Sequence, residues 1–140
     1  MQIEKYNGNA KNIVIPSEVC GHSVEMIAAM AFYENTNLES IVIPDTVKEL
    51  GHRVFAHCTN LERAVIGNSV EIIMEYSFFD CPNLKSVTVG KSIKTIKVSA
   101  FKLCPSLTSV NYYGTQESWS QISIAANNAA LVNAERAYRT

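Results

Sequence analysis

The sequence predicts a solenoid of about five coils of 23 residues, mainly β with short turns or helical turns, closed at the C-terminus by a short helical segment. Three sets of residues recur at a constant offset of 23 and predict this fold. They are Leu38, Leu61 and Leu84; Phe55, Phe78 and Phe101; and Cys58, Cys81 and Cys104. Self-similarity at a period of about 20 to 30 residues marks a repeat that buries its apolar face only by stacking on its neighbours.

Each coil is expected to begin with a strand and to continue into a second short strand before its phenylalanine. The first strand alternates apolar and polar residues, and Val, Ile and Thr favour a strand over a single helical turn in the second. We number the coils from Asn12, so that coils two to five begin at Leu38, Leu61, Leu84 and Leu107. In coil two the inward positions are Leu38, Ile41, Ile43, Val47, Leu50, Phe55 and Cys58. A lone unit could not shelter so many apolar side chains, so stability must come from contact between coils.

Coil one and the N-terminus depart from the repeat. Residues 1–11 form an N-terminal cap, in which Ile3 and Tyr6 can pack on coil one. Val19–Ser23 is an insertion that we expect to form a loop or a small hairpin bulging from the stack. Asn35 stands where later coils have cysteine, and its amide can satisfy backbone groups of the turn. All of residues 1–140 form one domain, with the repeats in residues 12–111.

The predicted C-terminal cap covers residues 112–140. Thr115 can N-cap a short helix with Ser118 three residues later, and Trp119 and Ile122 then lie on one helical face. The Ala-rich segment at 127–137 is expected to add either a second helical piece or a final edge strand at 134–138. Both alternatives remain open from the residues alone.

Composition excludes several classes of function. Lys plus Arg is 12 and Asp plus Glu is 13, with no basic run, which argues against nucleic acid or an anionic membrane as the main partner. No apolar run reaches the ~18 residues of a membrane span, and Met1–Pro16 lacks the features of a secretory signal. As written, the chain is expected to be a cytoplasmic protein or a piece of a longer one.

The four cysteines favour a reduced, buried ladder over disulfides. Equivalent residues on adjacent coils lie ~4.8 Å apart with parallel Cβ vectors, whereas a disulfide needs Cβ atoms ~3.8 Å apart and turned toward each other. Stacked thiols in a row also cannot converge tetrahedrally on zinc. Cys20 lies apart from the ladder and has no assigned role. We therefore expect no metal and no cofactor.

The repeat supplies few of the convergent polar groups that an enzyme needs. His57 and Cys58 are adjacent, but consecutive residues in extended or turn backbone point in different directions, which disfavours a catalytic dyad. No glycine-rich turn is followed by the Lys-Ser or Lys-Thr of a phosphate-binding loop. We therefore predict that the chain is not an enzyme.

A binding function has a more definite location, on the strand residues that point away from the core. These candidate binding residues form two parallel rows: Asn12 and Val14, Ser40 and Val42, Arg63 and Val65, Ser86 and Thr88, and Ser109 and Asn111. The valines make an apolar stripe suited to weak protein contact. The alternative is that β-branched residues are there because they favour strands. Tyr33, Glu75 and Tyr76 on the opposite rim form a second candidate.

Four segments stand out beside the period itself: Ile43-Pro-Asp-Thr-Val47, Phe55-x-x-Cys58-x-x-Leu61, Ile15-Pro-Ser-Glu-Val19 before Gly21-His-Ser-Val24, and Tyr112-Tyr-Gly-Thr-Gln-Glu-Ser-Trp119. Together they resemble the BspA-like leucine-rich repeats of bacterial cell-surface proteins, which also occur in some protists. The resemblance extends from Tyr6 to Tyr138 and implies a solenoid of leucine-rich repeats. Coil three departs from the pattern, with Gly67 in the Pro44 place and Met74 in the Gly51 place.

The resemblance implies a secreted or cell-surface protein whose repeats present an extended face to a protein or another cell-surface macromolecule. Two functional classes stay open. The first is a non-enzymatic adhesion or recognition module that binds through the strand face. The second is a structural spacer of a larger surface protein with no ligand of its own. The residues indicate neither the ligand nor the oligomeric state.

Overall fold

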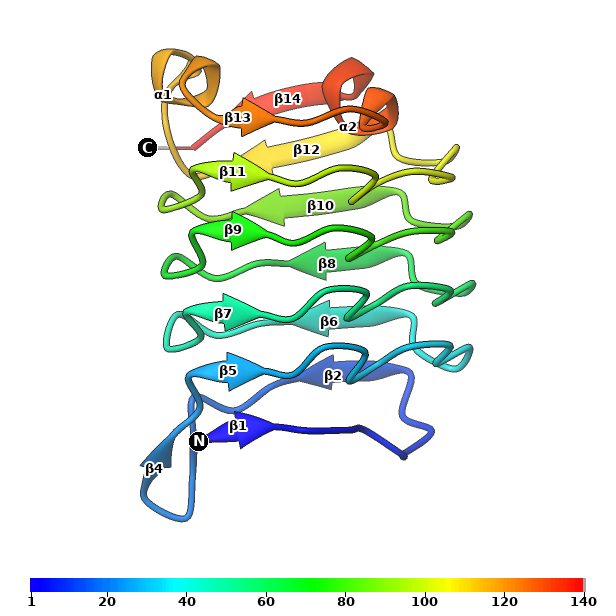
Figure 1. Ribbon diagram of the computed structural model, residues 1–140, viewed down its shortest axis with the longest axis vertical. Coiled ribbons are helices and arrows are strands. Elements are labelled where there is room, and N and C mark those ends of the chain that lie inside the picture. Colours follow the sequence, from blue (N-terminus) through cyan, green and yellow to red (C-terminus); the bar gives the residue numbers. More distant parts are fainter. Residues whose placement is uncertain (140) are drawn as a thin grey trace.

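The computed structural model describes residues 1–139 and shows a solenoid whose coils stack along one axis (Figure 1). The larger sheet, here the main sheet, has six parallel strands in the order β14-β12-β10-β8-β6-β2. Their bounds are β2 (Asn12–Val14), β6 (Ser40–Val42), β8 (Arg63–Val65), β10 (Ser86–Val89), β12 (Ser109–Tyr112) and β14 (Glu135–Tyr138). Ile41 pairs with Ala64 and Ala64 with Val87, so the ladder keeps the 23-residue offset of the sequence.

The second layer of the solenoid consists of two-residue strands on the other side of the core (Figure 1). One sheet contains β1 (Gln2–Ile3), β5 (Met26–Ile27) and β7 (Glu49–Leu50). The other contains β9 (Ile72–Ile73), β11 (Thr95–Ile96) and β13 (Ser123–Ile124). The prediction of a second short strand before each phenylalanine is therefore confirmed. The N-terminal cap follows the same geometry, because β1 pairs with β5 and Tyr6 stacks on Phe32.

The third side of each coil, here the turn side, runs from the second layer back to the main sheet. Its backbone enters the left-handed region at two repeat positions, occupied in coil two by Arg53 (φ 54°) and His57 (φ 60°). Non-glycine residues adopt this conformation at a cost in free energy. Hydrogen bonds between coils offset that cost: the Phe55 N–H donates to the Ser77 carbonyl at 2.8 Å, and the His57 N–H to the Phe79 carbonyl at 2.8 Å.

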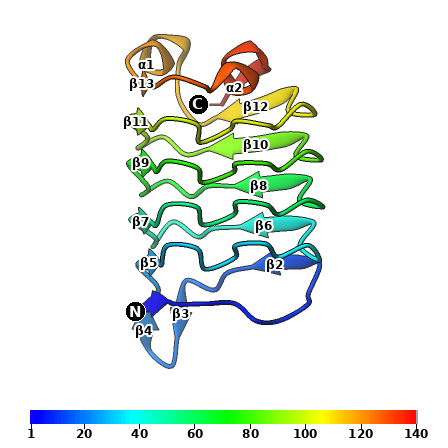
Figure 2. The same cartoon turned by 45° about the vertical axis from the view of Figure 1, so that its right-hand side comes forward.

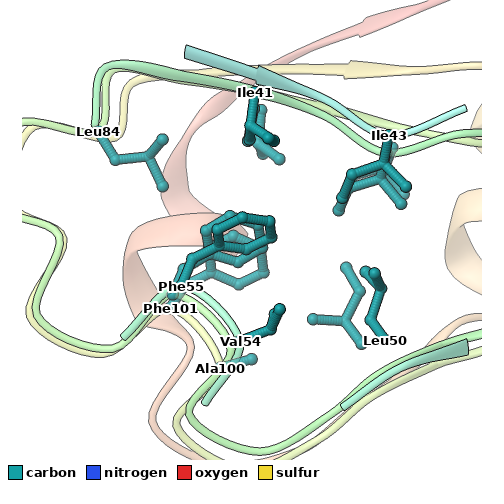
Figure 3. Packing of buried hydrophobic residues seen from close by; sticks show 14 of the residues in the cluster. Ile41, Ile43, Leu50, Val54, Phe55, Leu84, Ala100 and Phe101 are labelled. Carbon is teal, nitrogen blue, oxygen red and sulfur yellow. The ribbon is translucent and has the colours of Figure 1, made fainter. Parts of the chain in front are cut away.

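A column of phenylalanine rings fills the centre of the stack (Figure 3). Ring centroids are 5.3 Å apart from Phe32 to Phe55, 5.2 Å from Phe55 to Phe78 and 5.1 Å from Phe78 to Phe101. Ile41 and Ile43 approach the column from the main sheet, and Leu50 lies across from Ile43 (Figure 3). All seven predicted inward positions of coil two are at most 3% exposed, which confirms the predicted core.

The cysteines at the repeat position form a buried ladder, as predicted. Each thiol donates to a carbonyl of the preceding coil, with Cys58 bonding to Phe32 at 3.1 Å, Cys81 to Phe55 at 3.2 Å and Cys104 to Phe78 at 3.0 Å. Burial raises the pKa of the Cys58 thiol to about 12. A neighbouring thiol hydrogen bond and burial raise the pKa of Cys81 as well.

The insertion in coil one is a small hairpin, one of the two predicted forms. It consists of β3 (Glu18–Val19) and β4 (His22–Ser23), which pair antiparallel. The hairpin projects beyond the N-terminal end of the stack (Figure 2). Because it lies outside the ladder of coils, the stack continues past it with its register unchanged.

The C-terminal cap contains both of the alternatives that the sequence left open. Helix α1 (Gln116–Ser120) begins with the expected capping box, and Trp119 is buried at 7% exposure. Helix α2 (Ala129–Asn133) follows, and β14 then pairs with β12, which gives the main sheet its sixth strand. Among the described residues, no helix has the length and apolar character needed to span a membrane.

Candidate binding face

The candidate binding residues lie on the outer surface of the main sheet, here called the strand face, in two registered rows. Strand pairing places Asn12, Ser40, Arg63, Ser86 and Ser109 in the first row. It places Val14, Val42, Val65, Thr88 and Asn111 in the second. Alternation along each strand sends these side chains outward while their neighbours fill the core.

The second row changes from apolar to polar along the stack. Val14 is 72% exposed, and Val42 and Val65 are partly exposed. Farther along, Asn111 accepts a hydrogen bond from Arg139 at 3.2 Å. In the first row the Ser40 hydroxyl donates to the Asn12 side-chain oxygen at 2.7 Å. The second row therefore changes from aliphatic to hydrogen-bonding side chains, beside a first row that is polar throughout.

A hollow of about 290 Å³ borders the second row at the carboxyl ends of the strands. Val42, Val65 and Thr88 line one part of it, and Asn68 and Tyr113 line another. Tyr113 is 48% exposed. The sequence reasoning did not select Tyr113, although alternation after the inward Tyr112 places it outward.

The backbones of neighbouring coils approach each other closely at this hollow, because coils three and four carry glycine where coil two has Pro44. A Cβ on Gly67 would lie 2.5 Å from the Pro44 carbonyl oxygen, and one on Gly90 would lie 2.3 Å from the Gly67 oxygen. At the next residue a side chain also joins neighbouring coils, because the Asp45 side-chain oxygen accepts a hydrogen bond from the Asn68 N–H at 2.8 Å. The rim of the hollow is thus fixed by main-chain contact between coils.

Charged pairs between coils flank the first row at the amino ends of the strands. Lys85 and Glu62 are 2.9 Å apart, and Lys11 and Glu39 are 3.9 Å apart. The Lys85 ammonium, through its hydrogen bond and its charge, holds the pKa of the Glu62 carboxyl below its usual range. Arg63 next to this pair is exposed. Its guanidinium therefore adds a cationic group to a largely uncharged surface.

Strand β14 extends both rows by one position. Ser109 pairs with Glu135, and Asn111 with Ala137. Sequence reasoning missed these two residues because the C-terminal segment lacks the 23-residue repeat. The alternation Glu135-Arg-Ala-Tyr138 is the signal that could have found them.

The second candidate, on the turn side, consists largely of residues that tie coils together. The Tyr33 ring meets His57 edge-on at 5.4 Å, and the Arg53 guanidinium lies 4.9 Å from the Tyr76 ring centroid. These rings and charges already contact one another across adjacent coils. The strand face is therefore the better candidate for an outside partner.

His57 and Cys58 have separate partners. The His57 Nδ1 lies 2.8 Å from an Asp80 carboxylate oxygen, whereas the buried Cys58 thiol donates to the Phe32 carbonyl. The high pKa of Cys58 keeps its sulfur protonated at neutral pH. The arrangement does not provide an activated thiolate nucleophile.

The sequence matches one protein-family model and several solved structures. A model described as the BspA type leucine rich repeat region matches residues 5–129 in six copies. No curated protein matches the chain. A leucine-rich repeat protein from Bacteroides capillosus is 25% identical with a TM-score of 0.72, over 81% of this chain and 86% of that one.

Two longer structures share the fold over part of their length. A leucine-rich repeat protein of T. pallidum is 26% identical with a TM-score of 0.58, over 79% of this chain and 62% of that one. A protein described as a leucine rich cell surface protein from Faecalibacterium prausnitzii is 24% identical with a TM-score of 0.62, over 85% and 37%. This chain thus spans less than two thirds of each of these two proteins. The repeat, its buried ladder and the family match lead to one conclusion: the chain belongs to the BspA-type leucine-rich repeat family.

Proposed function

We propose that this protein is a non-enzymatic recognition module of a secreted or cell-surface protein, and that it binds a macromolecule through the strand face. One observation carries the proposal: a registered, outward apolar row that borders a hollow containing an exposed tyrosine. Aliphatic and tyrosine side chains surrounded by hydroxyls and amides are typical of the centre and rim of protein interfaces. The cell-surface description of the Faecalibacterium prausnitzii relative supports the proposed address.

The face has a chemistry that favours a protein partner. Val42, Val65 and Tyr113 supply contact area with few rotatable bonds, so ordering them on binding costs little entropy. Arg63 supplies the cationic group near the centre of the first row. Since the rows otherwise carry few charges, we expect the affinity to depend only weakly on salt concentration.

The test compares three labelled proteins on an array of purified surface proteins, matrix proteins and glycans. The wild type is compared with an Arg63→Glu, Val65→Glu double variant and with a Lys97→Glu, Val98→Glu control. The control changes an exposed basic residue and an exposed valine on the opposite side of the stack, so both variants alter the net charge equally. Thermal unfolding of all three shows whether folding is retained.

Binding by the wild type and the control but not by the strand-face variant would support the proposal. Binding that survives the strand-face changes would refute the assignment of the site. The absence of any partner for the wild type would favour the alternative function, a structural spacer in a larger surface protein.

A further inference from the structure

The second layer is interrupted between coils two and three. In the other coils a hydrogen bond joins equivalent positions: Gly51 N–H donates to the Ile27 carbonyl at 2.8 Å and Lys97 N–H to the Ile73 carbonyl at 2.9 Å. In the described chain, the Met74 N–H makes no such bond to the Leu50 carbonyl, and β7 does not pair with β9. Figure 1 shows β7 and β9 farther apart than the neighbouring strands of this layer.

A cavity of about 460 Å³ occupies the interruption, lined on one side by Leu50 and Gly51 and on the other by Ile72 and Met74. Ile72 is 40% exposed. Main-chain donors and acceptors that the repeat would pair across this gap are thus left to water.

The ion pairs along the second layer are interrupted at the same junction. Lys48 lies 3.5 Å from Glu25 within the N-terminal group of coils, and Lys94 lies 2.7 Å from Glu71 within the C-terminal group. Lys48 and Glu71 occupy equivalent positions on either side of the interruption, yet the described residues show no ion pair between them. These two ion pairs therefore strengthen the second layer within each group of coils but not across the junction.

The residues at one repeat position give a physical cause. A Cβ on Gly51 would lie 2.1 Å from the Ala29 nitrogen, so coil two sits tightly against coil one. Coil three has the larger Met74 in the same place, and its side chain lines the gap. The Lys97 N–H at this position in coil four makes the usual hydrogen bond to the preceding coil, so the presence of a side chain alone does not open the ladder. The break thus coincides with the junction at which the close approach of Gly51 is followed by the bulk of Met74.

The other two sides of the junction are intact. On the main sheet β6 pairs with β8 in register. On the turn side the Arg53 N–H donates to the Glu75 carbonyl at 3.1 Å, and the His57 Nδ1 lies 2.8 Å from Asp80. Coils two and three are therefore held along two edges and free along the third.

We propose that the junction between coils two and three is a hinge. The solenoid consists of two blocks, one ending at β7 and one beginning at β8, which open and close along the second layer. The paired strands β6 and β8 act as the pivot, so the motion changes the curvature of the main sheet. This inference goes beyond the proposed function, because it requires no ligand.

Amide hydrogen exchange tests the interruption with controls from the same chain. Protection of the Met74 N–H is expected to be at least about tenfold lower than that of the equivalent Gly51 and Lys97 amides, which are hydrogen-bonded. Equal protection of the three amides would overturn the proposal, since it would mean that the ladder is closed.

Spin-label distances test the motion itself. One label pair, at Glu49→Cys and Ser123→Cys, spans the interruption from β7 to β13, and a matched pair at Ser40→Cys and Ser109→Cys spans the same coils along the main sheet. Both pairs are built in a Cys20→Ser background, because Cys20 is exposed whereas the ladder cysteines are buried. A distance distribution that is clearly broader for the second-layer pair supports the hinge. Equally narrow distributions would overturn it, even if Met74 exchanges quickly.

Discussion

Replacing Phe78 by alanine should remove the centre of the aromatic column and destabilise the whole solenoid. Phe78 is fully buried, and its ring is stacked between those of Phe55 at 5.2 Å and Phe101 at 5.1 Å. The interplanar angles of 19° and 9° make both contacts nearly parallel. Because the rings belong to three successive coils, the substitution breaks the column in the middle.

The expected loss follows from the contacts. Burying a phenylalanine side chain contributes about 2–3 kcal/mol, and two aromatic contacts add about 1–2 kcal/mol together. The resulting loss of about 3–5 kcal/mol agrees with measured costs of phenylalanine to alanine changes in closely packed cores. The main sheet pairs coil three with both of its neighbours and restrains them, so the cavity cannot collapse fully.

Urea unfolding followed by circular dichroism measures this loss. A matched control is Leu103→Ala, at a side chain that is 54% exposed on the turn side, where the cost should stay below about 0.5 kcal/mol. A cost below about 1.5 kcal/mol for Phe78→Ala, with an unchanged denaturant slope, would refute the continuous core. A reduced slope would instead indicate that the two halves of the stack unfold separately.

Three further predictions concern backbone contact, the C-terminal cap and the buried thiols. Gly90→Ala should cost about 1–3 kcal/mol in thermal unfolding, because the new Cβ would lie 2.3 Å from the Gly67 oxygen. Asn128→Ala should cost about 2–3 kcal/mol in urea unfolding, since it leaves the buried Phe101 N–H without its acceptor at 2.9 Å. Stability should fall as pH rises above 9.0, because folding raises the pKa of Cys58 from 9.0 to about 12 and a deprotonated thiol favours the unfolded chain.

Each of these predictions has a matched control. Ser92→Ala and the exposed Asn133→Ala should each change stability by less than about 0.5 kcal/mol. Cys58→Ala should flatten the alkaline part of the stability curve while leaving the contribution of lysine and tyrosine residues in place. An unaltered pH slope in Cys58→Ala, or full stability in Gly90→Ala or Asn128→Ala, would contradict the corresponding argument.

The coil geometry was predictable because a fixed period forces a fixed register. Once Phe55 and Phe78 occupy equivalent places, the side chains around them must face the same core, and the outward rows follow from alternation along the strands. The insertion at Val19–Ser23 was recognisable for the same reason, since the repeat resumes after it. The placement of the candidate binding residues on one face is therefore a consequence of the period, whereas their proposed role in binding is not.

The hollow and the interruption could not be predicted in the same way. Tyr113 borders the hollow only because the close approach at Gly67 and Gly90 brings the turns of neighbouring coils together. The interruption lies where the close approach of Gly51 to Ala29 is followed in the next coil by Met74. The sequence shows that Met74 replaces Gly51, but the same position holds Lys97 in a coil that pairs normally. Whether a side chain at this position opens the second-layer ladder depends on the spacing between the backbones of two neighbouring coils. The sequence of a single repeat does not specify that spacing.

The ends of the stack show why the repeat must change where it stops. Within the stack, the Phe55 and Phe78 N–H groups donate to main-chain carbonyls of the next coil, at Ser77 and Ala100. For Phe101 the acceptor is instead the side-chain oxygen of Asn128, whose amide group in turn donates to the Lys97 carbonyl at 2.9 Å.

In coil one an asparagine side chain also accepts main-chain hydrogen bonds. The side-chain oxygen of Asn35 accepts from the Asn37 and Leu38 N–H groups at 3.2 Å each. A cysteine in that place would offer a thiol hydrogen but only a weak acceptor. In both end coils the side-chain oxygen of an asparagine therefore accepts hydrogen bonds from main-chain N–H groups. The two asparagines replace different contacts: in coil three the equivalent Leu61 N–H donates to the Cys58 carbonyl of its own turn at 3.1 Å, so Asn35 replaces a contact within the turn, whereas Asn128 replaces a hydrogen bond between coils.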